Sequence, residues 1–456
     1  MTHSSGKSIE DYLKPGMHAH LVGIGGVSMR PLGLVLRSQG MMISGSDMNA
    51  SVSTDELIQK GITVHIGHQA ENIRGADCII RTAAARNDNP EIAAARIQGI
   101  PVFERAQAWG VIMRHYENAI CISGTHGKTT TTSMITHIFM EAKKDPTVMI
   151  GGTLPLIHAG HRVGAGNTII LESCEYCNSF LNFYPTVALI LNIEADHLDF
   201  FKDLADIQAS FRKFAELVPA HGRIIANGDD ANTMEALNGL SCLTFGMSET
   251  DDVYGTNFSE DWKSFDVICE GTLYTHLNLR VVGRHNAMNA IAACAAAYHS
   301  GIPGSVAQAA LSRFTGAGRR MEFKGSYHGA DVYDDYAHHP AELHALLTAA
   351  RSLGYQRIIC AFQPHTYTRT KALFDDFVRE LRAADVAVLT DIYAARESNY
   401  IGISSKMIAD ALPGSVYCPS LQDVTAYLQE AAQPGDLILT VGAGDIFKAG
   451  DALLAL

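Results

Sequence analysis

One segment of this 456-residue chain constrains its fold and function more than any other. It is a glycine-containing turn at residues 124–129, with the sequence Gly-Thr-His-Gly-Lys-Thr. It follows an apolar run at residues 119–123, which predicts a strand, and it precedes a helical pattern. Glycines let successive N–H groups point at phosphate oxygens, and the following helix adds its positive N-terminal end. We expect Lys128 to reach the β- and γ-phosphates of a nucleotide and Thr129 to coordinate Mg²⁺. A phosphate-binding loop is predicted, although Ile122 replaces the first glycine of the common pattern.

A second glycine turn, Gly-Ile-Gly-Gly at residues 23–26, follows an apolar run at residues 18–22. A helical pattern comes next, and then a strand near residues 41–44 that we expect to stop at Gly-Ser-Asp. This order is typical of a Rossmann-like unit that binds a diphosphate attached to a ribose, as in NAD or a UDP-sugar. The phosphate loop favours the nucleotide sugar, because a dehydrogenase has no use for ATP. The binding residues expected here are Gly23, Gly25, Gly26 and Asp47.

The other apolar runs predict an α/β fold of three successive domains. They alternate with Ala-rich helical stretches, which is the pattern of parallel sheets. We expect a Rossmann-like first domain, a central P-loop domain that binds ATP and a C-terminal Rossmann-like domain, at residues 1–115, 116–317 and 318–456. The strands are expected at residues 78–80, 101–103, 168–171, 187–192, 357–362, 386–389 and 437–441, and a long helix at 285–298.

The composition narrows the classes of function. A formal net charge of −13 disfavours binding to a phosphate backbone, so we expect no nucleic-acid partner. The chain has no apolar run of bilayer length, and its first residues do not resemble a signal peptide, so no membrane insertion is expected. Nine scattered cysteines indicate reduced thiols. We predict a cytoplasmic protein, either a monomer or a homodimer.

Acidic and histidine residues follow two predicted strands of the central domain. Glu172 and Glu175 follow the run at 168–171, whereas Asp196 and His197 follow the run at 187–192. Ligands of open α/β sheets bind at this edge, so a carboxylate and an imidazole there could complete a Mg²⁺ site. Alternatively, these are ordinary polar residues of surface loops.

Two cysteines, Cys174 and Cys177, have the C-x-x-C spacing of zinc or redox sites. There is no second pair nearby and no thioredoxin-like pattern around them. We expect neutral thiols packed near the site.

A further polar group lies at residues 334–340 and 362–369, each segment after a predicted strand, with Arg319 and Arg320 before both. Any one of these histidines could be an ordinary surface residue. Together they supply acids, imidazoles and guanidinium groups suited to a reaction between anions, in which Arg320 would neutralise a transferring phosphoryl group. No Ser–His–Asp or Cys–His pattern is present, so a covalent nucleophile is not expected.

Taken together, these segments resemble the Mur ligase family, and in particular its members that join L-alanine to UDP-N-acetylmuramate. His126 in the phosphate loop is typical of those members. The resemblance covers essentially the whole chain, and it is carried by residues 23–26, 124–131, 194–197, 285–289, 335–340 and 362–365. It implies an ATP- and Mg²⁺-dependent ligase of peptidoglycan precursor synthesis that acts through an acyl phosphate.

The resemblance also implies roles for individual residues. The ATP-binding residues would be Gly124, Thr125, His126, Gly127, Lys128, Thr129, Thr130, Asn289 and Arg320. The metal ligands would be Thr129, Glu175 and His197, and the amino-acid site would contain His338, His365 and Arg369. The catalytic residues would be Lys128, Glu175, His197, Arg320 and Asp335.

Two departures from the family pattern and three alternatives stay open at this point. Ser28 stands where the family usually has glycine, and Cys174 and Cys177 replace frequent aspartates. The alternatives are a ligase that attaches a recycled murein tripeptide to the same sugar, a catalytically silent nucleotide-binding regulator, and an NAD-dependent oxidoreductase. The sequence does not choose between L-alanine, glycine and L-serine.

Overall fold

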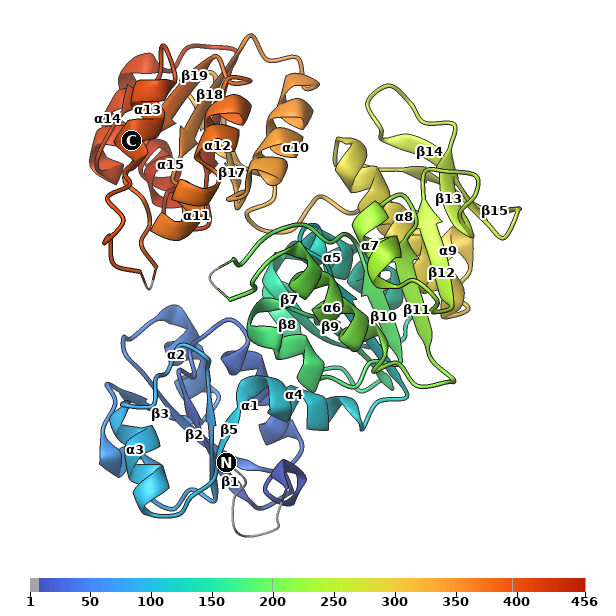
Figure 1. The fold of residues 1–456 in the computed structure, drawn as a ribbon, viewed down its shortest axis with the longest axis vertical. Coiled ribbons are helices and arrows are strands. Elements are labelled where there is room, and N and C mark those ends of the chain that lie inside the picture. The colour runs from blue at the N-terminus through green and yellow to red at the C-terminus, as the bar shows by residue number, and fades with distance from the viewer. Residues whose placement is uncertain (1–7, 199, 396, 456) are drawn as a thin grey trace. The chain divides into compact units, whose positions relative to one another are not determined.

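The computed structural model describes residues 8–198, 200–395 and 397–455, which contain three β-sheets covered by helices (Figure 1). The chain forms two compact units. Unit 1 comprises Met1–Gly152, Leu156–Ile193 and Gln208–Thr244. Unit 2 comprises Thr153–Pro155, Glu194–Ile207 and Phe245–Leu456. The predicted α/β fold class is confirmed.

The first sheet lies in unit 1 and is parallel, in the order β3-β2-β1-β4-β5. This is the Rossmann order, and the reversal between β1 and β4 places the glycine turn after β1 at the carboxyl edge of the sheet. The strands are β1 (His18–Val22), β2 (Met42–Asp47), β3 (Thr63–Ile66), β4 (Cys78–Arg81) and β5 (Val102–Glu104). The helices are α1 (Met29–Ser38), α2 (Val52–Gln59), α3 (Pro90–Ile97) and α4 (Arg105–Met113), with the 3₁₀ turns η1 (Ile9–Asp11) and η2 (Ala70–Ile73).

The second sheet has ten strands in the order β15-β14-β13-β12-β11-β10-β6-β9-β7-β8. Its unit 1 strands are β6 (Asn118–Ser123), β7 (Thr147–Leu154, to Gly152), β8 (Ala159–Arg162), β9 (Thr168–Glu172), β10 (Val187–Ile190) and β11 (Arg223–Asn227). The units divide within β12 (Cys242–Gly246), and unit 2 contains β13 (Val253–Thr256), β14 (Ser264–Cys269) and β15 (Thr272–Asn278). The helices are α5 (Lys128–Glu141), α6 (Leu204–Ala215), α7 (Ala231–Ala236), α8 (Arg284–His299) and α9 (Gly304–Leu311), with η3 (Pro155–Ile157) and η4 (Tyr176–Asn182).

The third sheet lies in unit 2, in the order β16-β17-β21-β18-β19-β20, and only its β16–β17 pairing is antiparallel. The strands are β16 (Glu322–Tyr327), β17 (Ala330–Asp335), β18 (Arg357–Phe362), β19 (Val386–Leu389), β20 (Val416–Tyr417) and β21 (Asp436–Val441). The helices are α10 (Pro340–Arg351), α11 (Tyr367–Ala372), α12 (Phe374–Leu381), α13 (Ser405–Ala411), α14 (Leu421–Ala431) and α15 (Phe447–Leu454).

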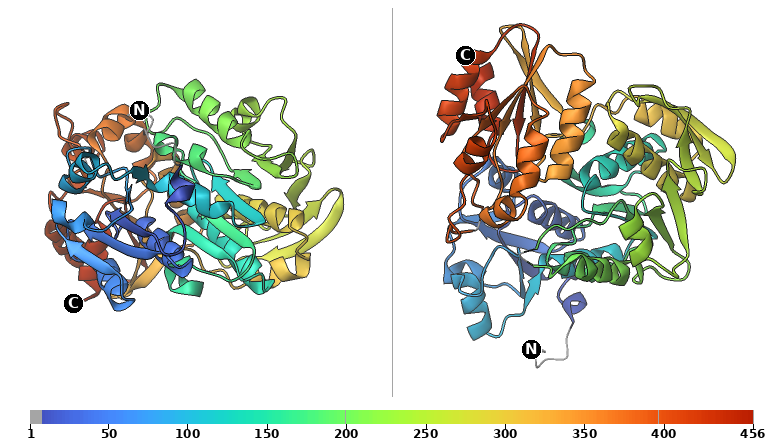
Figure 2. Two further views of the ribbon diagram at one scale, coloured as in Figure 1. Left: turned by 90° about the horizontal axis from the view of Figure 1, so that it is seen from below. Right: turned by 45° about the horizontal axis from the view of Figure 1, so that its top comes forward.

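Helices cover both faces of this third sheet, as the right-hand view of Figure 2 shows. Side chains alternate along a strand, so β18 sends Ile358, Cys360 and Phe362 into the core formed with α10, α12 and α13. Ile359 and Ala361 point into the opposite core, with α14 and α15. Because both faces of β18 are buried, its sequence is a nearly continuous run of apolar residues.

The strands that the sequence predicted are present, but several of their boundaries were wrong. β2 continues through Gly45, Ser46 and Asp47, because these residues pair with β1 and β3. β10 ends at Ile190, and Asp334 and Asp335 are the last residues of β17 instead of following it. The antiparallel strands β13–β15 were not predicted.

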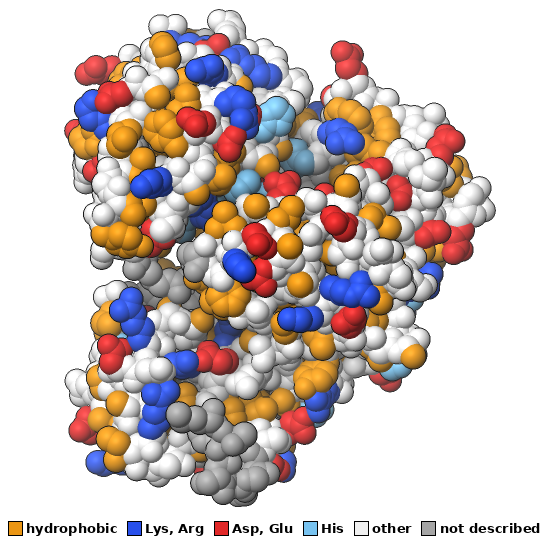
Figure 3. All heavy atoms as spheres, in the orientation of Figure 1, with side chains coloured by type: hydrophobic (Ala, Val, Ile, Leu, Met, Phe, Trp, Pro, Cys, Tyr) orange, Lys and Arg blue, Asp and Glu red, His pale blue; other side chains and the backbone are white. Residues whose placement is uncertain are grey.

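No helix in the described part of the chain is long and apolar enough to cross a membrane. On the face shown in Figure 3, acidic and basic side chains are interspersed among apolar ones.

Candidate active-site residues in the two units

The phosphate loop after β6 requires glycine at two positions. Gly124 has φ +140°, and a Cβ there would lie 2.9 Å from the Cβ of Leu191. Gly127 has φ +83° and forms the N-cap of α5, so Lys128 is the first helical residue. The loop therefore has the close turn and the helix N-terminus that suit a phosphate group.

Asn192, which follows β10, fixes the loop from the side. Its main-chain oxygen accepts the Thr125 N–H at 3.0 Å, and its Oδ1 accepts the His126 N–H at 2.8 Å. Its Nδ2 donates to the His126 oxygen at 3.1 Å. No role was predicted for Asn192 itself, because only folding brings the segment after β10 beside the loop after β6.

Lys128 is held by the loop and by a buried carboxylate. Its Nζ donates to the main-chain oxygens of Gly124 and Thr125, the second at 3.1 Å, and to Glu175 Oε2 at 3.1 Å. Burial alone would lower the pKa of Lys128, but the charge of Glu175, which is 2% exposed, raises it above its ordinary value. Lys128 is therefore a charged lysine held over the loop.

The next residue, Thr129, contacts the other predicted glutamate. Its hydroxyl donates to Glu172 Oε2 at 3.0 Å, and the Gly151 N–H donates to the same oxygen at 2.6 Å. Glu172 is the last residue of β9, so strand geometry directs its carboxylate to this edge of the sheet. The hydroxyl of Thr129 and the carboxylates of Glu172 and Glu175 are hard oxygen donors, which is the ligand type that suits Mg²⁺.

The two cysteines beside Glu175 differ. Burial, and then the charge of Glu175, raise the pKa of Cys174 to about 11, so this thiol is neutral at pH 7. Cys177 is exposed, with φ +55°. The expectation of two packed thiols was therefore wrong for Cys177, because its side chain is exposed. All nine cysteines are free thiols.

In the N-terminal glycine turn, the main-chain N–H groups of the three predicted glycines already donate hydrogen bonds within the protein. The N–H groups of Gly23 and Ile24 donate to the Ser46 oxygen at 2.8 and 3.0 Å, and that of Gly26 donates to the Gly23 oxygen at 3.1 Å. The Gly25 N–H donates to Asp47 Oδ2 at 2.9 Å. Asp47 thus shapes the turn directly. The glycines fix the path of the chain rather than present free donors.

The first free donors of this turn come just after the glycines. Among the described residues, the N–H groups of Val27 and Ser28 have no acceptor. Arg105, the first residue of α4, donates to the Ser28 hydroxyl, and Trp109 Nε1 donates to the Ser28 oxygen at 3.3 Å. No carboxylate of the described chain forms an ion pair with Arg105, and its neighbour Glu104 pairs with Arg81. Sequence reasoning missed Arg105.

In unit 2, Asp196 joins the segment after β10 to α11. Arg369 Nη2 lies 2.9 Å from Asp196 Oδ1, and Arg369 Nη1 lies 3.3 Å from His365 Nδ1. Burial alone would raise the pKa of Asp196, but Arg369, then His197 and His338, hold it below its ordinary range. The structure thus brings the predicted amino-acid residues His365 and Arg369 together with Asp196, whose charge Arg369 neutralises.

The two adjacent arginines after the glycine-rich segment have different surroundings. Arg319 donates to Asp334 Oδ2 at 2.7 Å and to the Gly442 oxygen at 2.7 Å, so it ties β17 to the turn after β21. Arg320 has a looser ion pair with Glu342, at 3.7 Å. Its guanidinium also lies over the Tyr336 ring, 5.4 Å from the ring centre.

Asp335 has a buried carboxylate that caps the local backbone. It accepts the N–H groups of Met321 and Ala337, both at 2.8 Å. Burial raises the pKa of Asp335 to about 6, although Arg320 acts in the opposite direction. These hydrogen bonds give Asp335 a structural role in addition to the implied catalytic one.

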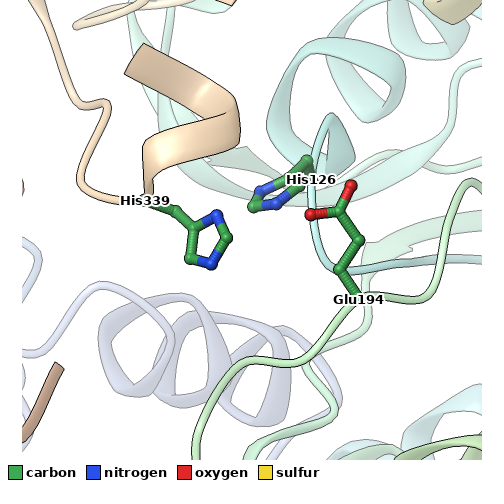
Figure 4. A group of neighbouring side chains, drawn as sticks. All are labelled: His126, Glu194 and His339. Carbon is green, nitrogen blue, oxygen red and sulfur yellow. The ribbon is translucent and has the colours of Figure 1, made fainter. Parts of the chain in front are cut away.

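Histidines surround the start of α10. Burial lowers the pKa of His338 to about 4, and its main-chain N–H donates to Glu342 Oε2 at 2.9 Å. Glu194 and His339 both belong to unit 2, and a carboxylate oxygen of the first lies within 4.8 Å of a ring nitrogen of the second (Figure 4). His126, drawn in the same figure, comes from the loop before α5 in unit 1.

The remaining predicted residues lie on α8 and after β10. Asn289 is buried on α8, and burial together with Arg320 lowers the pKa of its neighbour His285 to about 4. His197 has φ +54° and belongs to unit 2. The implied metal ligands are thus divided, with Thr129 and Glu175 in unit 1 and His197 in unit 2.

The fold and these residues define an α/β protein that combines a Rossmann-like turn with a phosphate loop. Sequence models of the Mur ligase family catalytic domain, the Mur ligase middle domain and the Mur ligase glutamate ligase domain match residues 18–117, 122–297 and 319–444. The chain belongs to the Mur ligase family and is a ligase. Mur ligases are ATP-dependent enzymes.

Individual relatives resemble the chain over nearly its whole length. The UDP-N-acetylmuramate–L-alanine ligase of Agathobacter rectalis is 46% identical over 97% of this chain and 99% of the relative. The structure of the UDP-N-acetylmuramate-alanine ligase of Thermotoga maritima has a TM-score of 0.82 at 28% identity and covers 96% of this chain and 98% of that one. A murein peptide ligase of Psychrobacter arcticus has a TM-score of 0.73 at 25% identity over the same shares.

Proposed function

We propose that this chain joins L-alanine to the lactyl carboxylate of UDP-N-acetylmuramate and converts ATP to ADP and phosphate, in peptidoglycan precursor synthesis. The observation that carries the proposal is the 46% identity, over nearly the full length of both chains, to an enzyme named for this reaction. The Lys128–Glu175 pair over the phosphate loop supports the use of ATP.

The reaction requires an activated carboxylate, because oxide is too poor a leaving group for direct attack by an amine. A lactyl carboxylate oxygen attacks the γ-phosphorus of ATP, the bond to the β–γ bridging oxygen breaks, and ADP leaves. The amine of L-alanine then attacks the acyl phosphate and loses a proton. The tetrahedral intermediate expels inorganic phosphate and leaves an amide.

We assign the phosphoryl-transfer step to residues of the phosphate loop. Lys128 would exchange its loop oxygens for β- and γ-phosphate oxygens while Glu175 keeps it charged. Arg320 would add positive charge to the transferring group, and Asn289 would contact the adenine. Thr129, Glu175 and His197 would hold Mg²⁺, which neutralises phosphate charge when bound.

We also assign one ligand to each predicted domain. The first domain, residues 1–115, would bind the UDP-sugar at the turn that Gly23, Gly25, Gly26 and Asp47 shape, through the free amides of Val27 and Ser28. The central domain, residues 116–317, would bind ATP. The third, residues 318–456, would bind L-alanine near His338, His365 and Arg369, with Asp335 supporting this region. We further propose a cytoplasmic location and a monomeric or dimeric state, which sedimentation would decide.

The test is phosphate release from ATP in the presence of Mg²⁺ and UDP-N-acetylmuramate, with L-alanine, glycine, L-serine or a murein tripeptide as the acceptor. Release that needs both the sugar and L-alanine supports the proposal. Release with the tripeptide alone would instead indicate a recycling ligase, and no release under any condition would indicate a silent nucleotide-binding regulator.

Exposed Lys144, just after α5, provides the control variant Lys144→Met for substitutions at Lys128.

A further inference from the structure

A fully buried carboxylate is connected to the N-terminal glycine turn through Ser46. Glu91 on α3 is 0% exposed and accepts hydrogen bonds from the Ser46 hydroxyl at 2.6 Å and from Asn72 Nδ2 at 2.7 Å. His68 Nδ1 lies 3.1 Å from the same Glu91 oxygen as Ser46, and 3.0 Å from the Ser46 hydroxyl. The carboxylate therefore joins α3 to β2, to η2 and to the segment after β3.

A buried histidine of β1 completes this group. His20 is 0% exposed, its Nδ1 contacts the Ser44 hydroxyl at 2.8 Å, and its Nε2 lies 3.7 Å from Glu91 Oε1. That Nε2 has no hydrogen-bond partner among the described residues. Burial lowers the pKa of His20, which leaves it neutral at pH 7. Burial would raise the pKa of Glu91, but the hydrogen bonds from Ser46 and Asn72 lower it to about 2, so the carboxylate is ionised.

The glycine turn depends on the residue that Glu91 holds. The main-chain oxygen of Ser46 accepts the N–H groups of both Gly23 and Ile24, while its side chain donates to Glu91. Ser46 also pairs with Val22, the last residue of β1. A displacement of Ser46 would therefore change the path of the turn at its first two residues.

We propose that Glu91 is a positioning residue for the nucleotide-sugar site, acting through Ser46 on the glycine turn. This inference rests on the proposed function, because it takes the turn as the place where the UDP-sugar binds. An ionised carboxylate is costly to bury. Here its oxygens order donors from three other segments of the same domain, and one of these donors is the side chain of the residue that shapes the turn.

Glu91→Gln is the sharpest substitution, because it keeps the size of the side chain and removes its charge. The new amide N–H group must face either Asn72 Nδ2 or the Ser46 and His68 donors. An amide that faces Asn72 Nδ2 sets a donor against a donor, and one that faces Ser46 forces its hydroxyl to turn and accept; in either orientation Ser46 loses a charge-assisted hydrogen bond. We expect the KM for UDP-N-acetylmuramate to rise about tenfold, while kcat and the KM for ATP stay within about twofold.

The experiment compares Glu91→Gln, Ser46→Ala and the double variant by steady-state kinetics and by calorimetric titration with UDP-N-acetylmuramate without ATP. If Glu91 acts through Ser46, the double variant loses no more affinity than the stronger single variant. Glu56→Gln is the matched control, since this α2 carboxylate pairs with Arg30 and Lys60 in the same domain. We expect it to leave the KM for the sugar unchanged.

The outcomes separate this inference from the proposed function. Unchanged affinity for the sugar in Glu91→Gln and Ser46→Ala, with normal affinity in the wild type, would overturn the role of Glu91 alone. Equal losses in the KM values for sugar and ATP and in the thermal midpoint would also overturn it, because they indicate general destabilisation. A wild-type chain that does not bind the sugar would overturn both. If Glu91→Gln does not fold, Ser46→Ala, which removes one hydroxyl, carries the test.

Discussion

Replacing Lys128 with methionine should separate the role of this lysine in stability from its role in catalysis. Its ammonium group is the ion-pair partner of Glu175, and the two side chains are only 14% and 3% exposed. Methionine fills similar space but removes the ammonium partner of this buried carboxylate. Breaking a buried pair in this way costs about 3–5 kcal/mol. For a domain of about 200 residues, 3 kcal/mol lowers the thermal midpoint by roughly 6–12 °C.

The double variant Lys128→Met with Glu175→Gln also removes the charge of the buried carboxylate. Its thermal midpoint should therefore recover most of the loss, since replacing both members of a buried pair is often nearly neutral. Phosphate release should not recover, because the cation is still missing and the assigned metal ligand Glu175 is changed as well. Losing a cation at the transferring phosphoryl group costs about 3–4 kcal/mol, which corresponds to a 100- to 1,000-fold loss in kcat.

Scanning calorimetry and sugar-dependent phosphate release, measured on the same preparations, check both parts of this prediction. Turnover that returns together with stability in the double variant would refute the catalytic assignment of Lys128, because the single variant would then be inactive only through misfolding. An unchanged thermal midpoint in Lys128→Met would refute the argument from the buried pair.

Three further predictions follow from single side chains. Iodoacetamide at pH 8 should alkylate exposed Cys177 before Cys174, because the pKa of Cys174 is raised to about 11. Peptide mass spectrometry measures both alkylation rates, and equal rates would contradict this prediction. Arg105→Gln should weaken UDP-N-acetylmuramate binding about tenfold in calorimetry, because this guanidinium has no carboxylate partner in the described chain. Arg105→Lys, which keeps the charge, should have a smaller effect. Unchanged affinity in Arg105→Gln would mean that Arg105 has only a structural role. The pKa of Asp335 rises on folding from 3.8 to about 6, so its protonated form contributes stability at low pH that is lost as the pH rises between these values. Relative to Asp335→Asn, the wild-type thermal midpoint should fall across that window, and parallel curves would contradict the shift.

Much of the fold was readable from the sequence, because strands buried on both faces give short, continuous apolar runs. The runs at 357–362 and 386–389 coincide with β18 and β19. The strands β13–β15 were missed because antiparallel strands with one exposed face alternate apolar and polar residues, as β14 does. Asn192 and Arg105 were missed for a different reason, since their importance comes from partners that are distant in the chain.

The sequence by itself determined the family, the fold class and the phosphate loop, because each depends on residues that are adjacent in the chain or repeat with a local period. Glycine at 124 and 127 and the lysine that follows are sufficient to predict such a loop. Only the tertiary structure decided which donors and charges are free. It showed that the main-chain N–H groups of Gly23, Gly25 and Gly26 already donate hydrogen bonds and that Arg319 binds Asp334 and Gly442. It also showed that Glu91 accepts a hydrogen bond from Ser46, the residue whose main-chain oxygen holds the turn. Hydrogen bonds and ion pairs form between segments far apart in sequence, so folding determines which groups remain available to a ligand.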